Sequence, residues 1–236
     1  TRREMDLAAS IQSFTEEAML KMGRHVHRET GEDNLCLAGG VALNCVANGR
    51  LLREGPFRGI WIQPAAGDAG SALGAALAAQ FGHHDVPRPA ARGLDRQQGS
   101  YLGPAFSEGE VEAYLLASGA VFRRRAPAQR AEQVAEALAQ GKVVGFFPGR
   151  MEFGPRSLGA RSILGDPRRE DTQRVMNLRI KFRESFRPFA PAVLAEDVGT
   201  YFQLDSPSPY MLLVAPVRRE RCLPRQAEIA ADEDLL

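Results

Sequence analysis

The sequence has few cysteines, and none of them belongs to a C-x-x-C motif. Cys36, Cys45 and Cys222 are widely spaced and odd in number, so we expect neither a disulfide framework nor a cysteine zinc site. The remaining interpretation is that these side chains serve as small buried hydrophobic residues.

Long hydrophobic runs are also missing. The longest ones, such as residues 75–79 and 210–216, are much shorter than the ~20 apolar residues that a membrane-spanning helix needs. No basic and apolar signal segment opens the chain. We therefore expect a cytoplasmic protein that has no membrane partner.

An excess of charge of one sign is absent as well. The 236 residues include 30 Lys and Arg against 29 Asp and Glu, which leaves a net charge of +1. Proteins that wrap duplex nucleic acid neutralise many phosphates and need a basic excess, so we predict no nucleic-acid partner. Any anion site must then be local. The length is sufficient for a large core and permits one large domain or two small ones.

The chain begins with Thr1 and passes directly into a helical pattern. Apolar residues recur at spacings of three and four, which predicts one face of a long helix that ends near Gly31. We expect a partial chain, whose partner is the missing remainder of its own polypeptide. The apolar stripe consists of Leu7, Ile11, Phe14, Ala18, Met22 and Val26.

The pattern that follows predicts an α/β fold. Two short apolar runs, 34–37 and 59–62, are separated by a glycine turn and a helical segment at 44–53, which is typical of a βαβ unit with parallel strands. A second glycine turn precedes an alanine-rich segment, 71–81, that we interpret as a buried helix.

Residues 83–100 are rich in proline, glycine and glutamine and predict a linker between domains 1–82 and 101–236. The second domain is expected to contain a helix at 108–118 that is opened by a capping box at Ser107 and Glu110. The other expected elements are a helix at 127–140, a buried strand at 142–147 and a further strand at 210–217.

Two glycine turns in the first domain are candidates for a ligand site. Gly39 and Gly40 would let the backbone approach a ligand, and the helix after them would offer its N–H groups to a phosphate. Asp68, in the second turn, is either a helix cap or an oxygen ligand for a divalent metal. Both turns follow parallel strands, at the edge where α/β sheets place ligands.

The segment 150–187 carries the strongest signal. It contains ten basic and five acidic side chains, a net charge of +5 against +1 for the whole chain. Gly154, Pro155 and Gly159 force turns, so the bases cannot share the face of one regular helix. Guanidinium groups on loops suit the capture of phosphates and carboxylates. We assign Arg168, Arg169 and Arg174 to surface ion pairs with Glu170 and Asp171.

Four motifs in order resemble the O-carbamoyltransferases of the NodU/CmcH type, and together they cover most of the chain. They are Gly39–Asn44, Gly67–Gly70, Gly149–Gly159 with Arg161–Leu164, and Lys181–Pro191. The resemblance implies that 1–82 is the C-terminal half of an actin/sugar-kinase-like (ASKHA) domain. It also implies that 101–236 is a YrdC-like α/β domain with an incomplete C-terminus.

The resemblance implies an ATP-dependent carbamoyltransferase that takes carbamoyl phosphate as donor, with Mg²⁺. Carbamoyladenylate would form in the YrdC-like domain. The carbamoyl group would then pass, in the actin-like domain, to a hydroxyl of a small acceptor. That acceptor would be a natural product, as in antibiotic tailoring, or a nodulation factor.

The resemblance also implies roles for individual residues. Asp68 would be one ligand of a divalent metal, Fe²⁺, whose other ligands lie on the missing upstream half. Carbamoyladenylate would be bound by Gly39, Gly40 and Asn44. Catalytic roles would fall to Arg150, Arg156, Lys181 and Arg187. ATP and carbamoyl phosphate would be bound by Arg150, Arg156, Arg161, Ser162, Lys181, Arg183 and Arg187.

A different class of function stays open at this point. YrdC-like folds can also present a basic groove to RNA, which would make the chain a non-catalytic nucleotide- or RNA-binding module. Such a groove uses aromatic side chains on which bases stack. Phe182, Phe186 and Phe189 are the aromatic residues that accompany the bases here.

Overall fold

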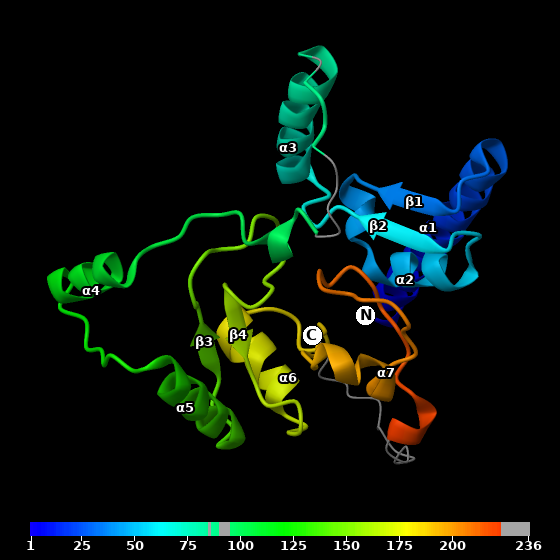
Figure 1. Cartoon of the computed structure of the whole chain (residues 1–236). Helices are drawn as coiled ribbons and strands as arrows, with labels where there is room; N and C mark the ends of the chain where they lie inside the picture. Colours follow the sequence, from blue (N-terminus) through cyan, green and yellow to red (C-terminus); the bar gives the residue numbers. More distant parts are fainter. Residues whose placement is uncertain (85, 90–94, 223–236) are drawn as a thin grey trace. The chain divides into compact units, whose positions relative to one another are not determined.

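The computed structural model describes residues 1–84, 86–89 and 95–222 (Figure 1). These residues form two compact units with a mixed α/β composition. The first unit holds the described residues of 1–100 together with 153–156 and 193–222, and the second holds 101–152 and 157–192. Segments 153–156 and 193–222, which we assigned to the C-terminal domain, therefore pack with the N-terminal part of the chain.

A parallel strand pair lies at the centre of the first unit. β1 (Asn34–Leu37) pairs in parallel with β2 (Gly59–Ile62), and α2 (Cys45–Glu54) connects them after a short 3₁₀ turn, η1 (Gly40–Leu43). The predicted βαβ unit is confirmed. Figure 1 shows the two strands side by side with α2 next to them.

The first helix, α1 (Arg2–Thr30), ends at Gly31 as predicted, because this glycine adopts the left-handed conformation (φ 69°) that closes a helix. Its covered face is not the expected stripe, since Phe14 is 72% exposed whereas Leu20 is 2% exposed. A Cβ on Gly23 would lie 2.9 Å from the Cδ1 of Leu51 in α2, so α1 packs on α2 through small and buried residues.

The alanine-rich segment forms the helix α3 (Asp68–Ala78), which continues into a π-turn, η2 (Ala79–His83). No residue of α3 is buried, so the prediction of a buried helix is wrong. Alanine stabilises a helix through its high helix propensity, whether or not the helix is covered. The alanine-rich composition therefore predicted the helix correctly but not its burial. Burial falls instead on Ala65 and Ala66 in the preceding turn.

The predicted linker ends in packed structure. Gln97 and Ser100 are buried, and Ser100 closes a short 3₁₀ turn, η3 (Gln98–Ser100). The backbone N–H of Phe153 donates to the carbonyl of Ser100 over 2.7 Å, which joins segment 153–156 to the first unit. Residues 85 and 90–94 of the linker lie outside the described residues.

The expected strand at 210–217 is wrong, because this segment is anchored to a helix rather than to a sheet. The Asn48 side chain of α2 donates to the carbonyl of Leu212 (3.0 Å). The N–H of Val214 donates to the carbonyl of Cys45 (3.1 Å). The β-type pairing of this segment is limited to an isolated antiparallel bridge between Val217 and Phe202. The preceding chain forms η5 (Ala195–Asp197) and α7 (Val198–Tyr201), and η6 (Arg219–Arg221) follows.

The second unit begins with two predicted helices. α4 (Glu108–Ala117) opens with the expected capping box, in which Ser107 Oγ accepts from the Glu110 N–H and the Glu110 carboxylate accepts from the Ser107 N–H. α5 (Pro127–Ala139) follows, with Pro127 at its first position. Both helices are confirmed.

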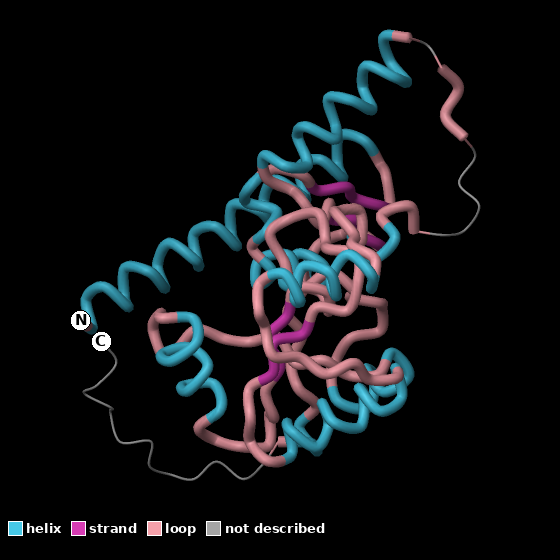
Figure 2. The backbone as a smooth tube through the Cα atoms, turned by 90° about the vertical axis from the view of Figure 1, so that its left-hand side faces the viewer, coloured by secondary structure: helices cyan, strands magenta, loops and turns pink. Residues whose placement is uncertain are grey.

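A short antiparallel pair, β3 (Val144–Phe146) with β4 (Ser162–Leu164), carries the rest of the second unit. The expected strand at 142–147 is thus shorter than predicted, and it is not buried, since Phe147 is 52% exposed. A strand of three residues with a single partner leaves much of its surface uncovered. After β4 the chain forms α6 (Thr172–Val175), which runs into the π-helix η4 (Met176–Lys181). In Figure 2 the strands are short and the loops between elements are long.

The cysteines are free, and they are not the buried residues that we expected. Cys36 and Cys222 are exposed and Cys45 is half-buried. On β1 the side chains alternate, so Leu35 and Leu37 take the covered side and Cys36 faces outward. None of the helices in the described ranges has the length and apolar character needed to cross a membrane.

The packing of α2 on segment 210–217 generates a prediction about Gly49. A Cβ at this position would lie 2.2 Å from the carbonyl oxygen of Val214, so Gly49→Ala must displace the segment. The cost of such overpacking, about 1–3 kcal/mol, exceeds the gain of about 0.5–1 kcal/mol from replacing a helical glycine. We expect a net loss of unfolding free energy in urea denaturation.

Gly74→Ala in α3 is the matched control, because no atom lies within 4 Å of its Cβ position. This variant should keep the full propensity gain and be more stable than the wild type by about 0.5–1 kcal/mol. Equal effects of the two substitutions would contradict the close approach of Val214 to α2.

Candidate functional site

The two predicted glycine turns of the first unit lie together. The N–H of Gly39 donates to the carbonyl of Ala66 over 2.8 Å, so the turn after β1 is bonded to the turn after β2. Gly39 has φ 99°, a conformation that favours glycine. The expected convergence of the turns at the carboxyl edge of the sheet is therefore present in the structure.

Asn44 is the N-cap of α2. Its Oδ1 accepts from the N–H of Ala47 over 3.1 Å, and its amide exchanges two hydrogen bonds with the amide of Gln12 in α1, at 2.8 and 3.2 Å. The side chain thus fixes the start of α2 and joins it to α1. Its predicted contact with carbamoyladenylate stays a prediction.

Arg156 belongs to the first unit, whereas the other bases that we assigned to phosphates belong to the second. Its Nη2 donates to the carbonyl of Leu43 over 3.0 Å, at the end of the turn that contains Gly40. Gly154, with φ 122°, would place a Cβ 3.2 Å from the Cβ of Ala65. The first unit therefore gathers residues from three of the four motifs.

Asp68 is the first residue of α3 and is exposed, and Gly67 rather than Asp68 occupies the N-cap position. Across residues 1–84, 86–89 and 95–222, no group of three or more His, Cys, Asp or Glu side chains is placed so as to hold a metal ion. A divalent metal needs several such ligands. The described residues alone do not fit a metal centre, and we derive no chemical step through one.

In the second unit, the fully buried carboxylate of Glu152 organizes the loop that precedes β4. Its Oε1 accepts from the N–H groups of Leu158 (2.5 Å) and Ala160 (2.8 Å), and its Oε2 accepts from Nε of Arg161 (3.0 Å). Burial by itself raises the pKa of this carboxyl. The hydrogen bonds from Ala160, Leu158 and Arg161 outweigh that effect and lower the pKa to about 2.

The other residues of this loop are also held by short contacts. Arg150 donates through Nη1 to the carbonyl of Gly103 (2.6 Å), and Ser162 Oγ accepts from the N–H of Gly159 (2.9 Å). Tyr101 donates its hydroxyl to the carbonyl of Leu158 (2.7 Å). Arg150, Arg161 and Ser162 therefore belong to one ordered loop system in the second unit.

The bases of the last motif lie at the end of η4 and on the loop that follows it. Arg183 donates through Nε to Oδ1 of Asn177 (2.6 Å), and its guanidinium lies 4.8 Å from the ring centre of Phe189. Arg187 pairs with Glu184 over 2.9 Å. Lys181 is the last residue of η4 and is exposed. The structure thus brings Lys181, Arg183 and Arg187 onto one short segment.

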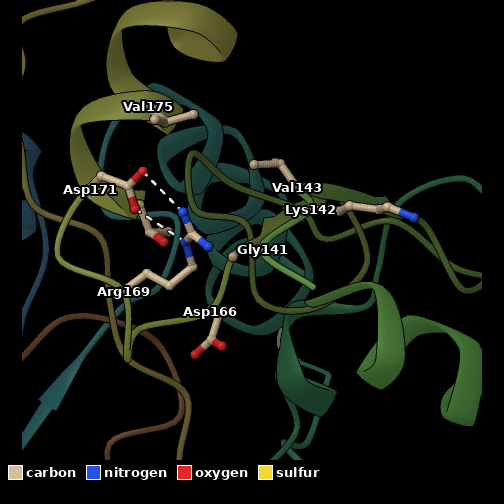
Figure 3. A pocket seen from close by; sticks show the side chains of 9 residues that line it. Gly141, Lys142, Val143, Asp166, Arg169, Asp171 and Val175 are labelled. Atoms are coloured by element: carbon tan, nitrogen blue, oxygen red, sulfur yellow. Dashed lines mark hydrogen bonds and ion pairs between the residues drawn. The ribbon is translucent and has the colours of Figure 1, made fainter. Parts of the chain in front are cut away.

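A small cavity of about 30 Å³ lies elsewhere in the second unit, between Gly141, Gly165 and Arg169. Figure 3 shows the Arg169 guanidinium directed at Asp171, with which it forms an ion pair at 3.2 Å. Asp166 pairs with Arg168 at 2.7 Å, and this guanidinium lowers the pKa of Asp166 to about 2. The predicted pair of Arg169 with Asp171 is confirmed, whereas Arg168 pairs with Asp166 and not with Glu170 or Asp171 as we expected. The cavity has room for about one water molecule.

Comparison with protein families identifies both ends of the chain. Residues 1–77 match the model described as carbamoyltransferase N-terminus, and residues 135–233 match the model described as carbamoyltransferase C-terminus. The chain belongs to the carbamoyltransferase family.

Individual relatives are similar to nearly the whole chain. An uncharacterized protein of Synechocystis is 60% identical over 230 residues, which cover 97% of this chain and 37% of that protein. Nodulation protein NolNO of Sinorhizobium fredii is 44% identical, over 94% of this chain and 32% of its own length. Nodulation protein U of Rhizobium tropici is 36% identical, over 91% and 35%. The chain thus spans about a third of the length of these relatives.

Two polar residues of the carbamoyltransferase fold were missed by the sequence analysis. In the sequence, Glu152 is an acidic residue within a basic segment. Its position between Arg150 and Arg156 could have suggested that it is buried and paired with an arginine. Asn177 left no signal, because a polar residue in a helical segment is usually solvated. Both side chains are buried and hold loops that carry predicted site residues.

The depressed pKa of Glu152 predicts a specific pH dependence of stability for this carbamoyltransferase chain. The carboxyl has a pKa of about 2 when folded against 4.5 as its ordinary value. Its ionised form therefore contributes its full stabilisation above pH 4.5, about 3 kcal/mol, and this is lost as the pH falls towards 2. Glu152→Gln should lower the unfolding free energy by about 2–3 kcal/mol at pH 7.

The difference between Glu152→Gln and the wild type should shrink as urea unfolding is repeated from pH 5 down to pH 3. Glu170→Gln, which changes an exposed carboxylate of the same segment, should stay within about 0.5 kcal/mol of the wild type throughout. A constant deficit of Glu152→Gln at all pH values would show that its charge does not organize the loop.

Proposed function

We propose that this chain forms part of an ATP-dependent O-carbamoyltransferase that uses carbamoyl phosphate and Mg²⁺. In this proposal residues 1–82 are the C-terminal half of an actin/sugar-kinase-like domain, and 101–236 form a YrdC-like domain. The observation that carries the proposal is the loop at 181–187, where one buried side chain holds a segment bearing three basic residues. The matches to both ends of the carbamoyltransferase family support it.

The first step proposed is formation of carbamoyladenylate. Water first cleaves carbamoyl phosphate into carbamate and inorganic phosphate. An oxygen of the carbamate then attacks the α-phosphorus of ATP, and pyrophosphate leaves. Negative charge develops on phosphate oxygens in this step, and fixed cations stabilise it. Lys181, Arg183 and Arg187 are suited to this role, together with Arg150 and Arg161 of the loop that Glu152 organizes.

The second step proposed is transfer of the carbamoyl group. A hydroxyl oxygen of a small acceptor attacks the carbamoyl carbon, and AMP leaves. In the first unit, the turn at Gly39 and Gly40 lies next to Arg156, which supports an adenylate site there. The similarity to nodulation proteins, NolNO and U among them, supports an acceptor of the natural-product or nodulation-factor class.

A second function is favoured by one observation. Phe182 is 85% exposed and Phe186 is 60% exposed, and both lie among the bases of the 181–187 loop. Exposed aromatic rings beside cations are the platforms on which single-stranded RNA stacks. The alternative is therefore a non-catalytic nucleotide- or RNA-binding module.

The proposal is tested by exchange of labelled pyrophosphate into ATP. The natural polypeptide that carries this sequence should catalyse exchange that depends on carbamoyl phosphate and Mg²⁺. Lys181→Ala should reduce the exchange rate by about 10²-fold or more, because a fixed charge at the phosphates is removed. Lys142→Ala, which removes an exposed lysine outside this loop, should leave the rate within about twofold.

The same variants separate the alternative. An RNA-binding module would show no carbamoyl phosphate-dependent exchange, and Lys181→Ala would weaken its binding to single-stranded RNA with a reduced salt dependence. Folded wild-type protein that binds RNA and catalyses no exchange would overturn the carbamoyltransferase proposal. The isolated 236-residue chain, assayed in parallel, would show whether these residues suffice for adenylation.

A further inference from the structure

Asn177 is buried with no exposed surface and lies in η4, at the base of the 181–187 loop. Its Nδ2 donates to two carbonyls of this loop, those of Ser185 (2.9 Å) and Arg187 (2.8 Å). Its Oδ1 accepts from Nε of Arg183 (2.6 Å). One side chain therefore contacts three alternate residues of a single loop.

The backbone of Asn177 adds a further restraint. Its carbonyl accepts from the N–H groups of Phe182 and Arg183, the latter at 3.1 Å. Phe182 takes the left-handed conformation (φ 48°, ψ 54°) at this point. A bulky residue adopts that conformation only where its surroundings enforce it. The sharp turn that begins the loop is thus enforced by hydrogen bonds to Asn177.

The chemistry of the contacts explains why an amide is used. Lys181, Arg183 and Arg187 repel one another, so the loop needs a fixed anchor if these cations are to lie close together. The anchor must accept from a guanidinium and donate to two carbonyls at once. A neutral amide has both functions, whereas a carboxylate would lack the donors. Leaving such buried groups without partners is costly, so the arrangement is stable only when all the bonds are made.

We propose that Asn177 is a positioning residue for phosphate binding, one that presents Arg183 and Arg187 in a preformed arrangement. This inference rests on the proposed function, since it assigns the 181–187 loop to the phosphates of ATP. Preformed cations bind a polyphosphate without the ordering cost that a mobile loop would incur. Gln173 supports the same arrangement from the surface, because its Nε2 donates to the carbonyls of Phe186 (3.2 Å) and Arg187 (3.0 Å).

The test compares two buried neighbours in η4. Asn177→Ala removes the anchor, whereas Met176→Ala removes a buried side chain that lies beside Gly165 and makes none of the hydrogen bonds that hold the loop. Both should lower the melting temperature. Binding of MgATP and of inorganic tripolyphosphate is measured by calorimetry on the natural polypeptide. Asn177→Ala should weaken both ligands about tenfold or more, and Met176→Ala should leave both within about twofold.

Two further variants extend the test, and the first of them keeps it decisive where a buried substitution prevents folding. Gln173→Ala changes an exposed residue and should weaken tripolyphosphate binding about two- to fivefold without a change in melting temperature. Asn177→Asp keeps an acceptor for Arg183 and loses the donors, so it should bind tripolyphosphate as weakly as Asn177→Ala.

Failure of the inference can be distinguished from failure of the proposed function. Equal affinities of Asn177→Ala and Met176→Ala would overturn the positioning role, even where the wild type catalyses pyrophosphate exchange. Conversely, wild-type protein that binds tripolyphosphate in an Asn177-dependent manner and catalyses no exchange would support the anchor and contradict the carbamoyltransferase reaction.

Discussion

The second unit depends on the hydrogen bonds that its loops make to buried polar side chains. Its strands have three residues each, and a sheet of this size supplies little backbone pairing with which to order a long segment. Glu152 takes over that role for residues 158–161, and Asn177 does so for residues 182–187. Because both side chains are buried, their bonds are made in a region of low dielectric, where a missing partner would be costly.

The first unit uses the same principle for a different purpose. Asn48 is buried in α2 and donates to the carbonyls of Ala42 (2.8 Å) and Leu212 (3.0 Å), so it joins the turn after β1 to a segment more than 160 residues later in the sequence. Arg53 donates to Val214 (2.8 Å) on the same side of the helix. Side chains of α2 thus provide hydrogen-bond donors for the carbonyls of Leu212 and Val214. These carbonyls need no neighbouring strand as a partner.

These contacts show which parts of the structure were predictable from the sequence. Local patterns predicted α1, α2, α4, α5 and the parallel pair of β1 and β2, because each of them depends on periodicity, capping or turn chemistry within a few residues. Burial was predicted poorly. The apolar stripe through Phe14 is exposed, and no residue of α3 is buried, because composition reports propensity and not what lies against a face.

In the candidate site, too, features that depend on neighbouring residues were predicted, and features that depend on distant contacts were not. The glycine turns and the basic segment were found from residue types, but Asn177 and Glu152 were not, since their importance arises from partners up to ten residues away on irregular loops. Placing Arg156 with Leu43 required a contact that spans 113 residues. No local rule links those positions.

The charges of the loops are already partly balanced in the protein. Arg161 pairs with Glu152 and Arg187 pairs with Glu184, so neither loop carries only uncompensated cations. The two pairs differ in environment, because Glu152 is fully buried whereas Arg187 and Glu184 are each about half exposed. An exposed pair is worth little and exchanges partners readily, whereas removing a charge from a buried carboxylate network is costly. In the proposed reaction, a phosphate that reaches these bases would therefore displace Glu184 from Arg187 and leave Arg161 attached to Glu152. Under that proposal Arg187 exchanges its carboxylate for a ligand, while Glu152 holds residues 158–161 and Asn177 holds the loop that carries Arg187.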